Sequence, residues 1–138
     1  MICVLVMGAA YVVFLSAGLI DPIGEGAAFP VDGIGADTVV LRYELAAGGK
    51  SAVVHDMVTL TDPSAVGRIL SIHNAMLLKN THRSIDKERY ALYFYQNGEL
   101  VERWHFDGKG LVDFSTRHGT YSVENDNFDM AYITGLVG

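Results

Sequence analysis

The chain has 138 residues, a single cysteine and a formal net charge of −6, with 10 Lys and Arg against 16 Asp and Glu. This length allows one folded domain, and the acidic balance argues against nucleic acid or an anionic lipid surface as the main partner. The one thiol, Cys3, excludes an intramolecular disulfide framework and a zinc site built from several cysteines.

The first twenty residues contain no Lys, Arg, His, Asp or Glu, and Asp21 followed by Pro22 ends this run. A helix of this length spans about 30 Å, the thickness of the hydrocarbon core of a bilayer. We therefore expect residues 1–20 to form an apolar helix that anchors the protein in a membrane. Two alternatives stay open. The run is a cleaved signal peptide, with small residues at 16–18 for cleavage, or it is buried core of a soluble fold.

Residues 21–37 are rich in glycine and contain two of the three prolines. This composition predicts a tether between the anchor and a folded domain, with Phe29, Val31 and Ile34 as apolar anchors for docking. Anchor and tether together predict a cell-membrane protein whose domain faces outside the cytoplasm. If the run is cleaved, they predict a secreted or periplasmic protein.

Apolar and polar residues alternate from Thr38 to Leu45, which predicts a strand, and a second strand follows over residues 51–61. Asp62 before Pro63 is typical of a capped helix start. The apolar positions that follow predict a helix with one buried stripe, running to about Lys79. His73 lies in this stripe, where a histidine is more often a paired core residue than a ligand or a proton switch.

Residues 89–124 predict an antiparallel meander of four strands, with turns at Asn97-Gly98, at residues 108–110 and at His118-Gly119. These turns fix a register in which one face packs against the helix. The register pairs Tyr95 with Leu100, Tyr93 with Glu102, Ala91 with Trp104, Phe106 with Val112, Trp104 with Phe114 and Phe114 with Val123. The packed face collects Tyr93, Tyr95, Leu100, Trp104, Phe106, Val112, Phe114, Tyr121 and Val123. The opposite face carries Leu92, Phe94, Val101, Arg103, His105, Asp113 and Ser115.

The predicted fold class is α+β. An N-terminal apolar helix precedes one helix packed on an antiparallel sheet, in the order β-β-α-β-β-β-β, with a further strand at residues 130–134. The folded domain extends over residues 38–138. The strand, the capped helix and the Asn-Gly hairpin between Val53 and Phe114 resemble small exported bacterial domains of unassigned function. This resemblance implies export.

In the predicted register His105 lies opposite Asp113 and beside Tyr90, and these three are the candidate catalytic residues. A carboxylate beside an imidazole fixes its tautomer, as a general base requires, and Ser115 is the nearest nucleophile. The alternative interpretation is a polar cross-strand pair that stabilises the sheet by ~0.2–1 kcal/mol.

A basic cluster between the helix and the meander offers a site for an anion or a lipid headgroup. It consists of Lys79, His82, Arg83, Lys87 and Arg89. The candidate binding residues are Arg103, His105, Arg83 and Lys87. Residues 124–129 are rich in oxygen ligands but lack the calcium-loop spacing, and the histidines lack a paired zinc spacing, so no metal and no cofactor is predicted.

The sequence therefore favours a non-enzymatic domain, tethered to a membrane or exported, that binds a protein or a small molecule or forms part of an envelope assembly. One alternative is a small hydrolase or lyase that uses His105 and Asp113. The other is a subunit of a membrane protein complex, in which residues 1–20 contact a partner helix.

Overall fold

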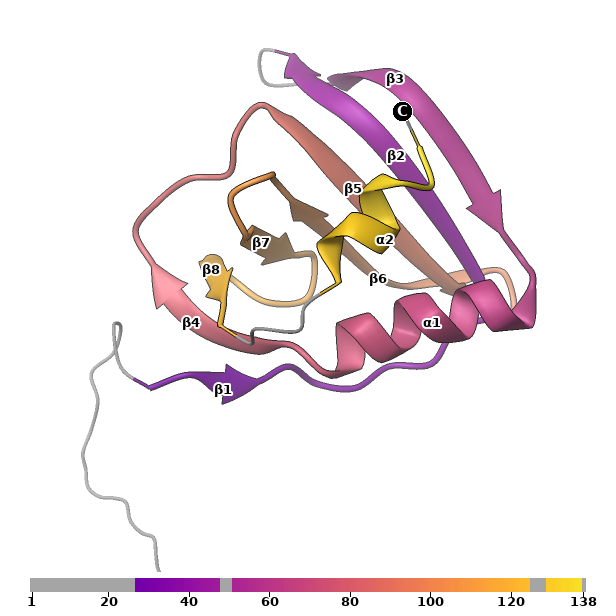
Figure 1. The fold of residues 1–138 in the computed structure, drawn as a ribbon, viewed down its shortest axis with the longest axis horizontal. Helices are drawn as coiled ribbons and strands as arrows, with labels where there is room; N and C mark the ends of the chain where they lie inside the picture. Colours follow the sequence, from indigo (N-terminus) through magenta and orange to yellow (C-terminus); the bar gives the residue numbers. More distant parts are fainter. Residues whose placement is uncertain (1–26, 48–50, 125–128, 138) are drawn as a thin grey trace, which may run out of the picture.

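The computed structural model describes residues 27–47, 51–124 and 129–137, which form an antiparallel sheet and two helices (Figure 1). The strands are β1 (Phe29–Pro30), β2 (Thr38–Ala47), β3 (Ser51–Leu60), β4 (Leu77–Thr81), β5 (Glu88–Gln96), β6 (Glu99–Phe106), β7 (Leu111–Phe114) and β8 (Thr120–Val123). The helices are α1 (Pro63–Asn74) and α2 (Met130–Thr134). The chain is thus α+β and mostly β, and the apolar helix predicted at residues 1–20 lies outside the described residues.

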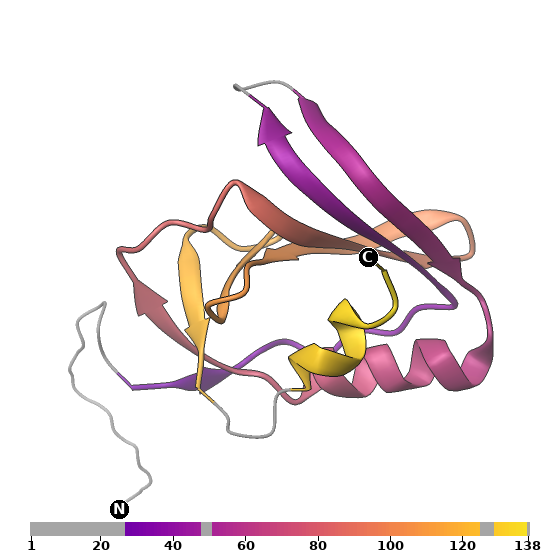
Figure 2. The ribbon, with the colours of Figure 1, turned by 45° about the horizontal axis from the view of Figure 1, so that its top comes forward.

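The sheet has eight strands in the order β1-β4-β8-β7-β6-β5-β2-β3, and each strand is antiparallel to its neighbours. It is strongly bent, and both helices lie on its concave side (Figures 1 and 2). The hairpin of β2 and β3 extends beyond the helices at one end, with β3 at the edge of the sheet. None of the helices in the described part of the chain is long and apolar enough to cross a membrane.

The hydrophobic core fills the space between the concave face and the helices. Its largest fully buried side chains are those of Trp104, Phe94 and Phe106, on β5 and β6. Ile69 of α1 and Ile133 of α2 pack into the same cluster and are fully buried. The prediction that the helix covers an aromatic face of the sheet is therefore confirmed, although some of the aromatic residues differ.

The predicted turn between β5 and β6 is present, with Asn97 at φ 54° and Gly98 at φ 83°. Tyr95 pairs with Leu100 as predicted, but an irregularity then shifts the register, so that Phe94 pairs with Glu102. The predicted pairing of Tyr93 with Glu102 is wrong, because a β-bulge adds one residue to one strand and reverses the alternation of faces beyond it.

Because of this bulge, the residues of β5 from Phe94 back to Tyr90 lie on the face opposite to the one predicted. Leu92 and Phe94 are fully buried in the core, whereas Tyr93 lies opposite Arg103 on the convex face. Leu92 pairs with Trp104, so the predicted pairing of Trp104 with Ala91 is also wrong. The segment from Tyr90 to Tyr95 is apolar or aromatic at every position, so its composition alone favours neither face.

The hairpin of β6 and β7 has the predicted register, with Trp104 opposite Phe114. Between β7 and β8 the connection is longer than predicted, and the predicted pairing of Phe114 with Val123 is wrong: Tyr121 pairs with Val112, and Val123 pairs with Leu78 of β4. The shift covers an even number of residues, so Phe114 and Tyr121 stay on the concave face and only the pairing is corrected.

Helix α1 begins as predicted, since the Oδ2 atom of Asp62 accepts a hydrogen bond from the Ala65 N–H at 3.1 Å. It ends at Asn74 rather than near Lys79, because the following residues form β4 between β8 and β1. The Asn74 side chain binds both the N–H and the carbonyl of Ile34, at 3.0 and 3.1 Å. Pairing with distant strands therefore outweighs the local helical pattern after Asn74.

Two more segments differ from their predictions. Residues 130–134 form helix α2 instead of a strand, with Asp129 accepting a hydrogen bond from the Tyr132 N–H at 3.2 Å. In the predicted tether, residues 27–37 include strand β1, and Phe29 and Ile34 pack against the core. This part of the chain thus lies along the domain.

His73 is a core residue, as favoured from the sequence. It is fully buried, and its ring lies 5.4 Å from that of Phe94 and 6.1 Å from that of Trp104. Burial lowers its pKa, although the hydrogen bond of Nδ1 with Asn74 at 2.8 Å and the charge of Glu102 act in the opposite direction. The imidazole is therefore held in its neutral form.

Candidate functional site

His105 and Asp113 face each other on β6 and β7, as predicted. The Nδ1 atom of His105 lies 3.0 Å from Oδ1 of Asp113 on the convex face of the sheet. His105 is buried and Asp113 is about one third exposed, with 32% of its side chain accessible. The pair has the geometry in which a carboxylate orients an imidazole.

Tyr90 does not belong to this pair. It lies opposite Phe106, and its ring stacks on those of Phe106 and Tyr43, each at 5.0 Å. Ala91 takes the predicted position of Tyr90 beside His105. The cause is the bulge between β5 and β6, which turns Tyr90 to the concave face.

The second ring nitrogen of His105 faces another carboxylate. Its Nε2 lies 3.8 Å from Oε2 of Glu44, a residue that is 2% exposed. Two guanidinium groups hold this carboxylate: Arg42 Nη2 is 2.9 Å from Oε1, and Arg89 Nε is 3.3 Å from Oε2. Asp113, His105, Glu44 and the two arginines thus form one polar network on the convex face.

Ser115, the predicted nucleophile, is engaged elsewhere. Its hydroxyl donates to Oε1 of Glu102 at 2.7 Å and accepts from the N–H of Arg103 at 3.1 Å. A general base must present one free ring nitrogen to the group that it deprotonates. In His105 one nitrogen contacts Asp113 and the other faces Glu44, so this arrangement favours a structural network over nucleophilic catalysis.

An open pocket of about 340 Å³ lies where β6, β7 and the connection between β7 and β8 meet. It is lined by Arg89, Arg103, His105, Asp113, Phe114, Arg117, His118, Gly119 and Thr120. Three of these side chains are arginines and only Asp113 is acidic. A protein with a net charge of −6 therefore gathers three of its ten Lys and Arg residues around one pocket.

The three arginines are engaged to different degrees. Arg89 binds the buried carboxylate of Glu44, and Arg117 lies 3.4 Å from the exposed carboxylate of Asp32. Arg103 forms no salt bridge within the described part of the chain, and its Nε is buried with no acceptor there. A guanidinium offers five N–H donors in a planar fork that matches carboxylate and phosphate oxygens. Arg103 is thus the strongest candidate for contact with an anion.

The predicted binding residues divide into two groups. Arg103 and His105 line the pocket, whereas Arg83 and Lys87 are exposed on the connection between β4 and β5 and are not among its lining residues. Sequence reasoning missed Arg117 as a site residue and placed His118 only in a loop. The sequence signal for this part of the site was the pair of adjacent basic residues Arg117 and His118 before Gly119. Their position beside Arg103 depends on the pairing of β7 with β8, which the sequence does not show.

Within the described residues no group of three His, Cys, Asp or Glu side chains is placed to hold a metal ion, and residues 125–128 of the oxygen-rich segment lie outside the described residues.

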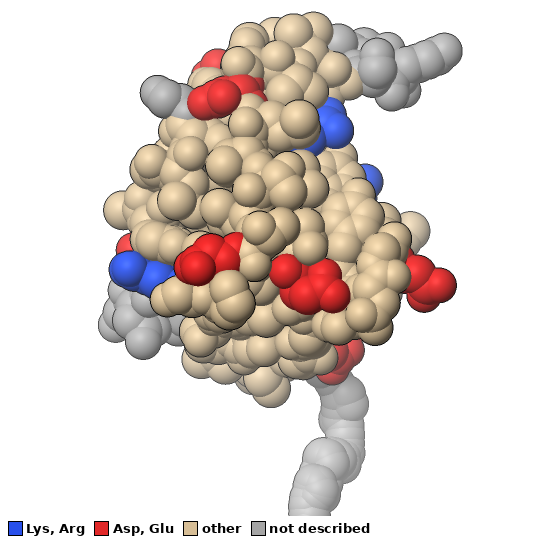
Figure 3. Space-filling view, turned by 90° about the vertical axis from the view of Figure 1, so that its right-hand side faces the viewer, with Lys and Arg blue, Asp and Glu red and all other residues tan. Residues whose placement is uncertain are grey.

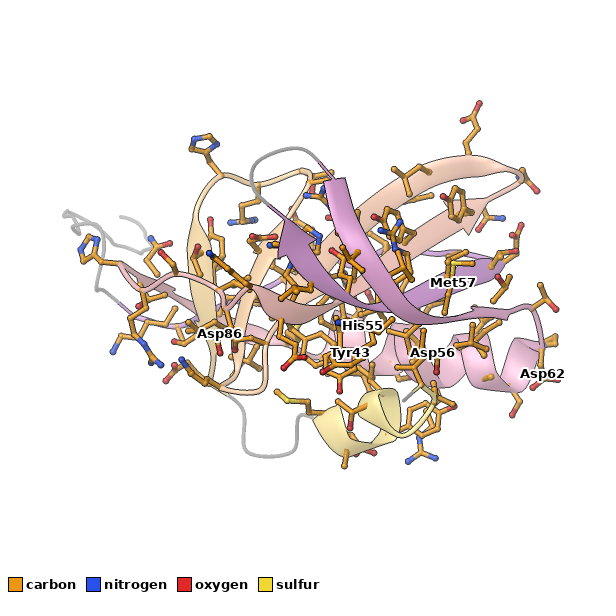
Figure 4. The ribbon with its side chains drawn as sticks, turned by 90° about the horizontal axis from the view of Figure 1, so that it is seen from above. Tyr43, His55, Asp56, Met57, Asp62 and Asp86 are labelled. Atoms are coloured by element: carbon orange, nitrogen blue, oxygen red, sulfur yellow. The ribbon has the colours of Figure 1, made fainter. Side chains whose placement is uncertain are left out.

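Tyr43 and His55 lie close together, with ring centroids 5.3 Å apart (Figure 4). A hydrogen bond with Glu88, supported by burial, raises the pKa of Tyr43 to about 12. The side of the molecule at the right of Figure 1 shows more acidic than basic side chains (Figure 3).

Comparisons of the chain with protein-family models, with curated proteins and with solved structures found no match.

Proposed function

We propose that this protein is a non-enzymatic domain that binds an anionic group in the pocket lined by Arg89, Arg103 and Arg117. The observation that carries the proposal is the excess of three guanidinium groups over one carboxylate around an open pocket. Arg103 is half-buried, and its Nε is buried without an acceptor in the described part of the chain, so an oxygen anion in the pocket can form charge-assisted hydrogen bonds with its guanidinium.

The size and chemistry of the pocket narrow the ligand class. A volume of about 340 Å³ lies at the lower end of the range for small-molecule sites. The side-chain donors among the lining residues are guanidinium, imidazole and hydroxyl groups. These features favour a small polar molecule, or the end of a larger one, that carries a phosphate, sulfate or carboxylate group.

The charge-free run at residues 1–20 supports a setting at a membrane or outside the cytoplasm. In this proposal the run is an anchor, and the domain presents its pocket on the outer side as a binding component of an envelope assembly. Extraction of membranes with carbonate tests the anchor, because a full-mass chain that stays in the pellet supports it and a full-mass chain in the cytosol contradicts it.

The binding proposal is tested with the full-length protein and inorganic phosphate as the probe, by isothermal titration calorimetry at low ionic strength. Arg103→Gln should weaken phosphate binding about tenfold or more, since a hydrogen bond to a charged group contributes about 1.5–3 kcal/mol. Arg83→Gln is the matched control, because Arg83 is exposed and does not line the pocket. A loss in Arg83→Gln alone would move the site to the basic cluster, and no phosphate binding by the unaltered protein would refute the proposal.

A second candidate function is hydrolysis or elimination by His105 and Asp113. The contact of 3.0 Å between them and their place in the pocket wall support it. It is tested with chromogenic carboxylate and phosphate esters. Turnover that is lost in His105→Asn would support catalysis, and equal background rates for both proteins would refute it.

A further inference from the structure

A short segment at the edge of the sheet contacts Arg117, one of the residues that line the pocket. We call Phe29–Asp32 the strap. It begins with β1, in which Phe29 and Pro30 pair with β4, and the Val31 N–H donates to the carbonyl of Met76 at 3.1 Å. Only two residues of the strap are in the sheet, so few backbone hydrogen bonds hold it, and such segments have a low local stability.

The strap holds one of the three pocket arginines. The guanidinium carbon of Arg117 lies 5.1 Å from the ring centroid of Phe29, and its Nη2 lies 3.4 Å from Oδ2 of Asp32, which is 85 residues away in the sequence. The ring of Tyr121 lies 6.0 Å away from the same guanidinium. Aromatic rings near a guanidinium orient it, so Phe29 and Tyr121 restrict the position of the Arg117 guanidinium.

The ion pair between Arg117 and Asp32 is weakly held. The side chain of Asp32 is 92% exposed and that of Arg117 is 34% exposed. A carboxylate in this setting is well solvated and gives little net energy to the pair. It nevertheless occupies hydrogen-bond donors of Arg117 that an anionic ligand needs.

From these contacts we infer that Asp32 is a built-in competitor of the anionic ligand, and that the strap sets the affinity of the pocket through Arg117. This inference rests on the proposed function. The ligand anion takes the place of the Asp32 carboxylate at Arg117, while Phe29 keeps the guanidinium oriented toward it. Because coupling between two sites is reciprocal, a ligand that displaces Asp32 also loosens the strap, and a force or partner acting on the chain before Phe29 changes ligand affinity.

The test measures the affinity of the full-length protein for inorganic phosphate by calorimetry in five variants. Asp32→Asn should raise the affinity about two- to fivefold, the range expected for one exposed ion pair. Phe29→Leu keeps an apolar side chain in β1 but removes the ring, and it should lower the affinity about two- to fivefold. In a protein that already carries Arg117→Gln, the Asp32→Asn change should have no effect. Glu99→Gln, at the exposed turn between β5 and β6, should leave the affinity unchanged and controls for net charge.

The outcomes separate this inference from the proposed function. Phosphate binding that depends on Arg103 but is the same in Asp32→Asn and in the unaltered protein would contradict the inferred role of the strap. The proposed function would still stand. An equal gain in Glu99→Gln, or a gain that persists in the Arg117→Gln background, would also contradict the role of the strap, since the effect would then reflect overall charge. No phosphate binding in any variant would refute the proposed function itself.

Discussion

The Nε2 atom of His105 lies 3.8 Å from the carboxylate of Glu44, although the two residues belong to β6 and β2 and β5 runs between these strands. The contact is possible because Ala91 of β5 lies opposite both His105 and Arg42. Its methyl group leaves room above the sheet for longer side chains from both neighbouring strands. A small residue in the central strand thus joins the charges of three strands into one network.

We predict that Glu44 and Asp113, the two carboxylates around His105, contribute unequally to stability. Glu44→Gln should lower the free energy of unfolding by about 1–3 kcal/mol, because a buried charge that faces Arg42 and Arg89 is removed. Asp113→Asn should cost less than about 1 kcal/mol, because this side chain is 32% exposed. Urea denaturation at pH 7 measures both, and equal losses would show that burial of Glu44 is not what matters.

The small side chain of Ala91 gives a second prediction. Ala91→Leu should destabilise the protein by about 1–3 kcal/mol, because Ala91 is fully buried between His105 and Arg42 on the neighbouring strands and the added atoms crowd them. Ala91→Gly, which leaves this space open, should cost about 0.5–1 kcal/mol through backbone entropy alone. Denaturant midpoints of the two variants, compared at one pH, check the order, and a neutral Ala91→Leu would contradict the crowded arrangement.

The buried imidazole of His73 predicts a pH dependence of stability. Burial lowers its pKa in the folded state, whereas an unfolded histidine titrates near ~6.5. The unfolded chain therefore binds the extra proton first. Stability should fall as the pH decreases below about 6.5, by up to about 1.4 kcal/mol per pH unit for this one group.

Free energies of unfolding between pH 8 and pH 5 measure this slope. His73→Leu should flatten it, and His118→Gln, which changes an exposed histidine, should leave it intact. Asp37 adds a separate effect at lower pH. Its pKa is lowered by the backbone N–H of Asn97 and the hydroxyl of Thr38, so its contribution is lost below about pH 4. If the decrease in stability between pH 8 and pH 5 persists in His73→Leu, groups other than His73 cause it.

Two glycines should respond in opposite directions to the same substitution. Gly98 has φ +83° in the turn between β5 and β6, so Gly98→Ala should destabilise by about 1–2 kcal/mol. Gly67 is exposed in α1, with no neighbouring atom within 4 Å of an added Cβ, so Gly67→Ala should stabilise by about 0.5–1 kcal/mol. Thermal or urea denaturation of both variants tests the pair, and the same sign in both would contradict this account.

Local signals in the sequence predicted the elements whose cause is local. Asp62 and Pro63 mark the start of α1, Asn97 and Gly98 form their turn, and the alternation from Thr38 is strand β2. The opposition of His105 and Asp113 was predictable because the short turn at residues 108–110 leaves only one register for β6 and β7. Each of these features depends on residues that are close in the chain.

The predictions of secondary structure and of side-chain orientation were wrong where pairing with strands distant in the sequence decides them. The residues after Asn74 continue a helical pattern but form β4, since their backbone groups form hydrogen bonds with β8 and β1. The bulge in β6 sends Phe94 inward and Tyr93 outward, and neither residue type signals that choice. Residues 130–134 are apolar enough for a strand, yet they form α2 over the core.

The sequence by itself determined the α+β class, the capped helix, the hairpins and the pair of His105 with Asp113, because short-range geometry and two-residue alternation suffice for these. Only the tertiary structure decided that Arg89, Arg103 and Arg117 surround one pocket and that Asp32 reaches Arg117. These residues come from different strands and loops. Their approach depends on strand order, on one bulge and on the docking of the strap, which long-range packing sets and which no local pattern encodes.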